Sequence, residues 1–87
     1  MAHTPNPYPA LDDTQYEAIV NGQYMKSTFS SASGGCLSFT LTDGLIGFQD
    51  DKLPPPERKT RTLIFTQPEL AAFLNGAKNG DFDHLLD

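Results

Sequence analysis

Apolar and polar residues alternate most clearly in the middle of the chain, in the stretch CLSFTLTDGLIGFQDD. The alternation predicts two strands joined by Asp43-Gly44, since both residues tolerate the positive φ of a type I′ hairpin turn. That turn sets the register, so Phe39 faces Phe48. One face of the ribbon carries Leu37, Phe39, Leu41, Ile46 and Phe48, and the opposite face carries Ser38, Thr40, Gly47 and Gln49. A lone hairpin is only marginally stable, so we expect its apolar face to be covered.

The C-terminal stretch TQPELAAFLNGAKNG predicts the helix that covers this face. Thr66 and Glu69 form a T-x-x-E capping box, and Pro68 suits the first turn because its missing N–H costs nothing there. Apolar residues then recur at helical spacing, at Leu70, Phe73, Leu74 and Ala77. Gly80 is placed to end the helix. We therefore expect the apolar stripe of this helix to pack on the hairpin.

The remaining segments predict a small α+β fold. TRTLIFT predicts another strand, with Leu63 and Phe65 on one face and Thr62 and Ile64 on the other. QYMKSTFS is a weaker strand candidate, SSASGG is a loop, and DDKLPPPERK is a proline-stiffened excursion outside the sheet. The prediction is an antiparallel meander of three to four strands with a C-terminal helix packed on one face.

The N-terminal segment predicts little packed structure. Residues 1–13 hold three prolines and indicate an extended tail. Asp13 is a candidate N-cap for a short helix over TQYEAIV, and Asn21-Gly22 predicts a turn after it. The expected organisation is a tail with a possible short helix over residues 1–22 and a single domain over residues 23–87.

Length and charge limit the classes of function. The 87 residues have room for one domain, and their single cysteine excludes an intrachain disulfide. The net charge is −5, which disfavours direct contact with nucleic acid or anionic lipid. We see no secretory signal and no apolar run that would span a membrane, and we expect a cytoplasmic protein.

No group of residues indicates a reaction, a cofactor or a metal. Cys36 lacks a nearby histidine to activate it as a nucleophile, so a small strand residue is the better interpretation. Asp50 and Asp51 are adjacent on a strand and point to opposite faces, so they do not converge on one ion. Ser31 and its neighbours in SSASGG lack the setting of a hydrolase nucleophile. We therefore predict a protein that is not an enzyme.

Two charged segments are the candidate partner-binding sites. The first runs through the excursion after the hairpin and contains Asp50, Asp51, Lys52, Arg58 and Lys59. The second lies near the C-terminus and contains Asp81, Phe82 and Asp83. Both are also compatible with plain solvated surface, although apolar residues interleaved with acids at a terminus can fold onto the same domain or onto a second chain.

The chain resembles a known family in YMKSTFSSASGGCLSF, GLIGFQDDK and, above all, LIFTQPELAAFLNGAKNGDFD. These segments are similar to the domain of unknown function 397 family, the BldB-like small acidic regulatory proteins of actinobacteria. The similarity covers about residues 23–83. The positions that agree with the closing motif of that family are Phe65, Thr66, Glu69, Phe73, Leu74, Gly76, Lys78, Gly80, Phe82 and Asp83.

The resemblance implies a regulatory role. Members of the family are thought to act with helix-turn-helix transcriptional regulators of the Xre type, in development or antibiotic production, and the resemblance also allows a homodimer. The resemblance implies an accessory protein that binds such a regulator and affects DNA binding only indirectly, through that regulator. The alternative that the resemblance leaves open is a toxin or antitoxin component of a two-gene module.

Overall fold

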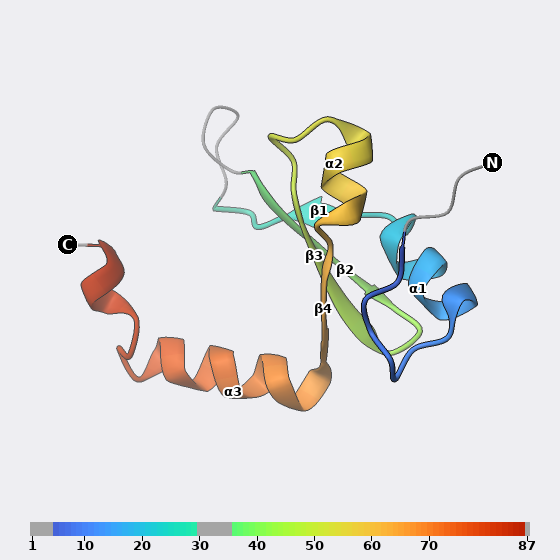
Figure 1. Cartoon of the computed structure of the whole chain (residues 1–87). Helices are drawn as coiled ribbons and strands as arrows, with labels where there is room; N and C mark the ends of the chain where they lie inside the picture. Colours follow the sequence, from blue (N-terminus) through green and yellow to red (C-terminus); the bar gives the residue numbers. More distant parts are fainter. Residues whose placement is uncertain (1–4, 30–35, 87) are drawn as a thin grey trace.

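The computed structural model of the chain describes residues 5–29 and 36–86, so the predicted SSASGG loop lies outside the described residues. The helices are α1 (Asp13–Val20), α2 (Pro55–Thr60), α3 (Gln67–Lys78) and the 3₁₀ helix η1 (Asp83–Leu86). The strands are β1 (Met25–Lys26), β2 (Leu37–Thr42), β3 (Leu45–Asp50) and β4 (Leu63–Thr66). They form one antiparallel sheet in the order β1-β2-β3-β4 (Figure 1). The predicted α+β class, with a β-meander and a C-terminal helix, is confirmed.

The central hairpin forms as the sequence predicts. Asp43 and Gly44 have positive φ angles of 54° and 75°, which is the conformation that a type I′ turn requires. Phe39 pairs with Phe48, and Leu41 pairs with Ile46. The Asp43-Gly44 turn therefore forms as predicted and sets the predicted register.

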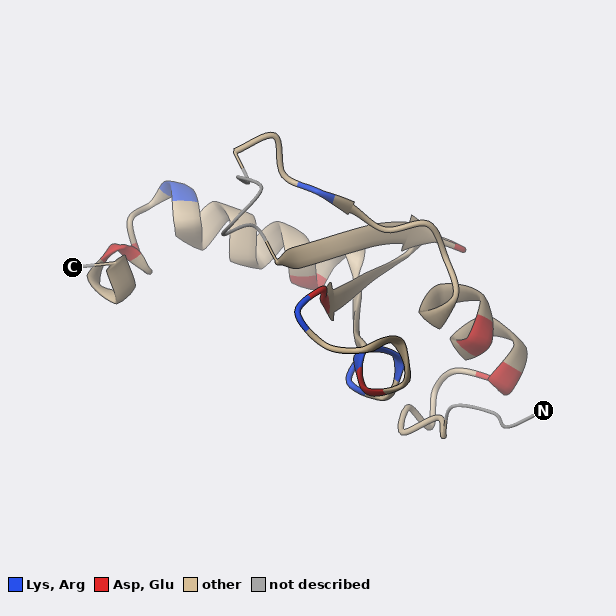
Figure 2. Ribbon diagram, turned by 90° about the horizontal axis from the view of Figure 1, so that it is seen from above, with Lys and Arg blue, Asp and Glu red and all other residues tan. Residues whose placement is uncertain are grey.

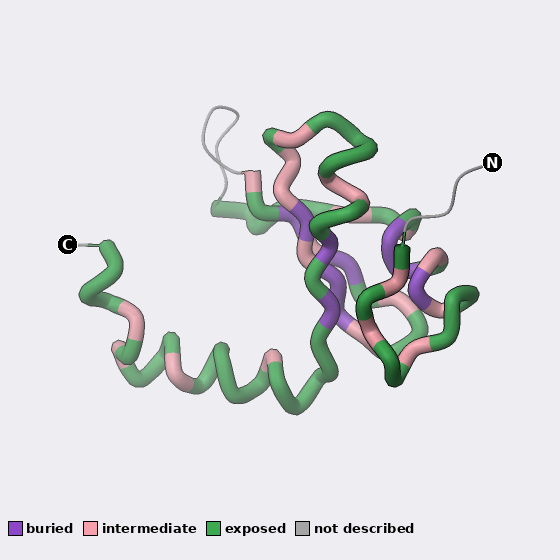
Figure 3. Tube along the Cα trace, in the orientation of Figure 1, coloured by how far each residue is buried: buried purple, intermediate pink, exposed green. Residues whose placement is uncertain are grey.

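The core covers the polar face of the sheet. Ser38, Thr40 and Gln49 are buried, whereas Leu37 is 63% exposed and Leu41 is 65% exposed. In Figure 3 the buried segments lie in α1 and in the middle of the strands, and α3 contains none. We call the face with Ser38 the inner face and the face with Leu41 the outer face.

Helix α1 covers the inner face. Asp12, rather than the predicted Asp13, is its N-cap, and Asp12 forms a capping box with Gln15. Its apolar side is fully or almost fully buried: Tyr16, Ile19 and Val20 form the core cluster with Ile64 of β4. The short helix that the sequence offered only as a possibility is thus the main cover of the sheet.

The segment before α1 also packs, so the prediction of an unpacked tail is wrong for residues 5–12. Tyr8 and Leu11 pack against the core cluster, and the backbone N–H of Ile64 donates to Tyr8 Oη at 2.8 Å. The ring of Tyr8 lies 6.4 Å from the ring of Tyr16. Prolines in this segment limit its conformations without preventing contact with β4.

The inner face accepts a helix because its side chains are small or hydrogen-bonded. Gly47 has no side chain, and a Cβ placed there would lie 2.8 Å from Ile19 Cγ2. Gln49 Nε2 donates to the backbone carbonyl of Val20 and to Thr62 Oγ1, both at 3.0 Å. Burying these polar groups costs little because each finds a partner inside the protein.

Two further segments differ from the sequence prediction. The proline-rich excursion contains the helix α2, whose first turn accepts prolines because the N–H groups there need no partner within the helix. The strand predicted in QYMKSTFS is only β1, Met25–Lys26, paired with Phe39 and Ser38.

Helix α3 does not bury the outer face. It begins without a connecting loop, since Thr66 is both the last residue of β4 and the N-cap of α3. The predicted capping box with Glu69 is present, but no residue of α3 is buried. From β4 the helix extends sideways, away from the sheet (Figure 1). The radius of gyration is 14.1 Å, compared with about 12 Å for a compact chain of this length.

Tyr24 provides a pH-dependent test of the inner packing. Its hydroxyl donates to the carbonyl of Ile19 at 2.8 Å, and burial raises its pKa from 10.0 to about 12. Because the folded pKa exceeds the unfolded one, this contribution to stability is complete below pH 10 and is lost as the pH rises through 12. We expect alkaline titration of tyrosinate absorbance to show this late ionisation, and Tyr24→Phe to remove it. Ionisation of Tyr24 at pH 10 in the folded protein would contradict the packing.

Candidate functional site

A groove of about 820 Å³ lies between the outer face and α3. The sheet contributes its apolar side chains, and α3 contributes the stripe predicted to be in the core. The residues that line the groove are Gln23, Met25, Phe39, Thr40, Leu41, Thr42, Ile46, Phe48, Gln67, Leu70, Phe73 and Leu74. We call this hollow the outer groove.

The outer groove is open and uncharged. Within the described part of the chain, none of its lining residues carries a charge. Leu41, Phe73 and Leu74 remain 65%, 53% and 46% exposed, while Ile46 at its floor is buried. Exposed apolar patches of this kind mark binding sites for other proteins or for apolar ligands. Its described lining holds no carboxylate, imidazole, amine or thiol.

Helix capping holds the wall of the groove in place. The backbone N–H of Thr66 donates to Glu69 Oε1 at 2.8 Å, and this hydrogen bond lowers the pKa of the Glu69 carboxyl. Gln67 Nε2 reaches across to the carbonyl of Gly44 in the hairpin turn at 3.3 Å. These contacts fix the direction in which α3 leaves the sheet.

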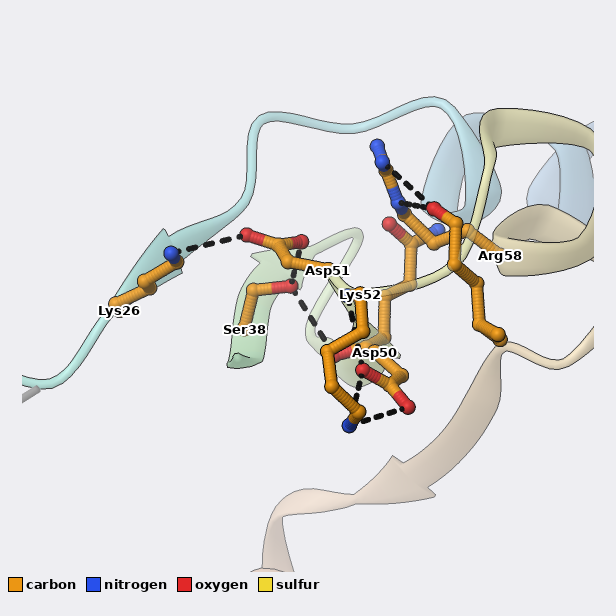
Figure 4. A network of polar contacts seen from close by, with 8 residues as sticks. Lys26, Ser38, Asp50, Asp51, Lys52 and Arg58 are labelled. Atoms are coloured by element: carbon orange, nitrogen blue, oxygen red, sulfur yellow. Dashed lines mark hydrogen bonds and ion pairs between the residues drawn. The ribbon is translucent and has the colours of Figure 1, made fainter. Parts of the chain in front are cut away.

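Most of the predicted residues of the first charged segment have partners within the chain (Figure 4). Lys52 Nζ lies 2.9 Å from the carboxylate of Asp50, and its hydrogen bond lowers the pKa of Asp50. Asp51 accepts a hydrogen bond from Ser38 Oγ at 2.9 Å and lies 3.7 Å from Lys26 Nζ. These contacts lie at the end of the hairpin that is opposite the turn. Exposed ion pairs of this kind contribute little to the stability of the fold.

Part of this segment lines a second, smaller hollow of about 340 Å³. Asp51, Arg58 and Lys59 meet there beside the C-terminal end of α1. The guanidinium of Arg58 donates to the carbonyl of Leu53 at 2.9 and 3.2 Å. One acidic and two basic side chains thus line this hollow.

The second predicted segment lies at the far end of α3. The ring of Phe82 stacks on Phe73 at 4.9 Å, so Phe82 extends the apolar wall of the helix. Asp81 accepts from Asn79 Nδ2 at 2.9 Å, and Asp83 begins η1. Figures 1 and 2 both place this end of the chain away from α2, so the structure does not bring the two charged segments together.

Cysteine and metal-ligating side chains do not gather in one place among the described residues. Cys36 is half-buried before β2, and no cluster of three histidine, cysteine, aspartate or glutamate side chains is found among residues 5–29 and 36–86. In the same part of the chain, no helix has the length and apolar character needed to cross a bilayer.

The sequence analysis assigned the apolar residues of the hairpin and of α3 that line the groove to the core, and so missed them as a site. Alternation shows which residues share a face of a strand, but it does not show which face points inward. One signal was available: the strand ending at Thr66 runs directly into a helix that Thr66 caps, which leaves no loop for folding back. No family model, curated protein or solved structure matches the chain.

Proposed function

We propose that the chain is a non-enzymatic accessory protein that acts by binding another protein through the outer groove. The observation that carries this proposal is the exposure of the more apolar face of the sheet, beside a helix without buried residues. When another protein binds to this apolar surface, the surface is removed from water, and this contributes to the affinity.

The partner that we propose is a helix-turn-helix regulator of the Xre type in the cytoplasm. The family resemblance supports this choice. The charge also supports it, because a net charge of −5 is complementary to the basic face of a DNA-binding protein. The accessory protein binds the regulator and thereby changes how the regulator binds DNA, without contacting DNA itself.

The test is capture of the tagged full-length chain from its host, compared with two variants. Leu41→Asp places a charge in the groove, whereas Ala72→Asp places the same charge on the opposite side of α3. We expect the wild-type chain and Ala72→Asp to recover a helix-turn-helix protein in stoichiometric amount, and Leu41→Asp to lose it.

Equal capture by all three chains would contradict the groove as the binding site. Failure of all three to recover such a protein would contradict the choice of partner. Growth arrest when the chain is expressed alone would favour the toxin alternative.

A further inference from the structure

We propose that the outer groove binds a single amphipathic helix of the partner protein, which carries apolar residues along one side and basic residues beside them. This inference rests on the proposed function, since it states which part of a partner occupies the same groove. The walls of the groove, the edges of the sheet and the charges around the groove each support it.

The groove has two apolar walls, namely the outer face of the sheet and the stripe of α3. Ile46 is buried at the floor, whereas Leu41, Phe73 and Leu74 on the walls remain exposed. A pocket for a small molecule buries most of the surface of its ligand, which a groove this open does not do. A helix is a cylinder about 10 Å across, and its apolar stripe can contact both walls at once.

The edges of the sheet offer little to an extended peptide. At the β4 edge, the backbone N–H of Ile64 donates to Tyr8 Oη and that of Thr66 donates to Glu69 Oε1, both at 2.8 Å. At the other edge, β1 is only two residues long. A strand that adds to a sheet gains affinity from backbone hydrogen bonds along an edge, so the described edges favour this mode less than the groove favours a helix.

Two carboxylates lie at the end of the groove where α3 begins. Asp43 is in the hairpin turn, and Gln67 of α3 donates to the carbonyl of Gly44 in the same turn. Glu69 is in the first turn of α3, and the hydrogen bond from the backbone N–H of Thr66 lowers the pKa of its carboxyl. Both acidic residues are exposed, so each can attract a cation on a helix in the groove.

The other charges beside the groove do not reverse this sign. Beyond the end of α3, Asp81 and Asp83 follow Lys78. Lys26 of β1 has its ammonium 3.7 Å from the carboxylate of Asp51. The described charges around the groove are therefore negative overall, as is the whole chain, with a net charge of −5. A helix with lysine or arginine beside its apolar stripe is complementary to these charges, whereas an acidic helix would be repelled.

The experiment compares two peptides of about 14 residues, or about four helical turns, that contain the same leucines and lysines. In the helical peptide the leucines recur three and four residues apart, and in the strand peptide they alternate with lysine. Isothermal titration calorimetry with the full-length chain gives Kd. We expect the helical peptide to bind at least about tenfold more tightly than the strand peptide. Far-ultraviolet circular dichroism should show that its helicity rises on binding, because a free helix of this length is marginal in water.

Three variants locate the site. Leu41→Asp should weaken binding at least about tenfold, although its added negative charge would strengthen a nonspecific attraction to a basic peptide. Asp43→Asn with Glu69→Gln should weaken binding about three- to tenfold, while asparagine and glutamine preserve the turn and the capping box. The matched control, Asp13→Asn with Glu57→Gln, removes the same charge from α1 and α2, which lie away from α3 (Figures 1 and 2). It should change Kd by no more than about twofold.

Equal binding of the two peptides would overturn the inference. A Kd that Leu41→Asp leaves unchanged would also overturn it, and so would a loss at Asp43 and Glu69 no larger than the loss in the matched control.

Two results separate this inference from the proposed function. Capture of the regulator through Leu41, without binding of the helical peptide, would overturn the helix as occupant and leave the function in place. Binding of the helical peptide through Leu41, with no regulator captured, would support the inference and remove the proposed partner.

Discussion

Replacing Ile19 with alanine is expected to lower the free energy of unfolding by about 2–5 kcal/mol. Ile19 is completely buried between α1 and the inner face, and truncating it leaves a cavity beside Gly47. The matched control is Leu37→Ala on the outer face. Leu37 is 63% exposed and does not line the groove, so its truncation should cost less than about 1 kcal/mol.

Urea unfolding followed by circular dichroism measures both variants. A loss at Leu37 as large as the loss at Ile19 would contradict the assignment of the faces, because it would mean that the apolar face of the hairpin is the buried one. Far-ultraviolet spectra of the two folded variants should match the wild-type spectrum, which excludes a change of fold as the cause.

Replacing Gly47 with alanine is expected to destabilise the protein by about 1–3 kcal/mol, although alanine is only one methyl group larger. The added Cβ would lie 2.5 Å from Tyr24 Oη and 2.8 Å from Ile19 Cγ2, both closer than atoms pack. Thr40 Cγ2, at 3.2 Å, leaves little room on the third side. Either α1 or the Tyr24 ring must then move away from the sheet.

A double-mutant cycle with Tyr24→Phe shows whether the clash has this cause. Removing the Tyr24 hydroxyl removes the nearest atom, so Gly47→Ala should cost less in the Tyr24→Phe background than in the wild type. Equal costs in the two backgrounds would contradict the close approach of Tyr24 to β3.

The local elements of this chain could be predicted because their signals are local. Asp43-Gly44 specifies the hairpin turn, and the turn then specifies which residues pair. Thr66 and Glu69 specify the start of α3 in the same way. Backbone conformation and hydrogen bonding between near neighbours decide these features, and the sequence displays both.

The choice of covered face could not be predicted from the same signals. Hydrophobicity favours burial of the face with Phe39 and Leu41. Gly47 and the hydrogen-bonded Gln49 instead let α1 approach the polar face closely. That choice depends on shape and on partners far apart in sequence, such as Gln49 and Val20. Leu41, Phe73 and Leu74 were consequently recognised as apolar but assigned to the core, although they are exposed.

Thiol labelling of neighbouring strand positions tests the central claim most directly, namely that the polar face of the sheet is inside and the apolar face outside. Thr40→Cys and Leu41→Cys point to opposite faces of β2, and Cys36→Ser removes the native thiol. We predict fast labelling at position 41 and strong protection at position 40. Protection at 41 with fast labelling at 40 would contradict the account.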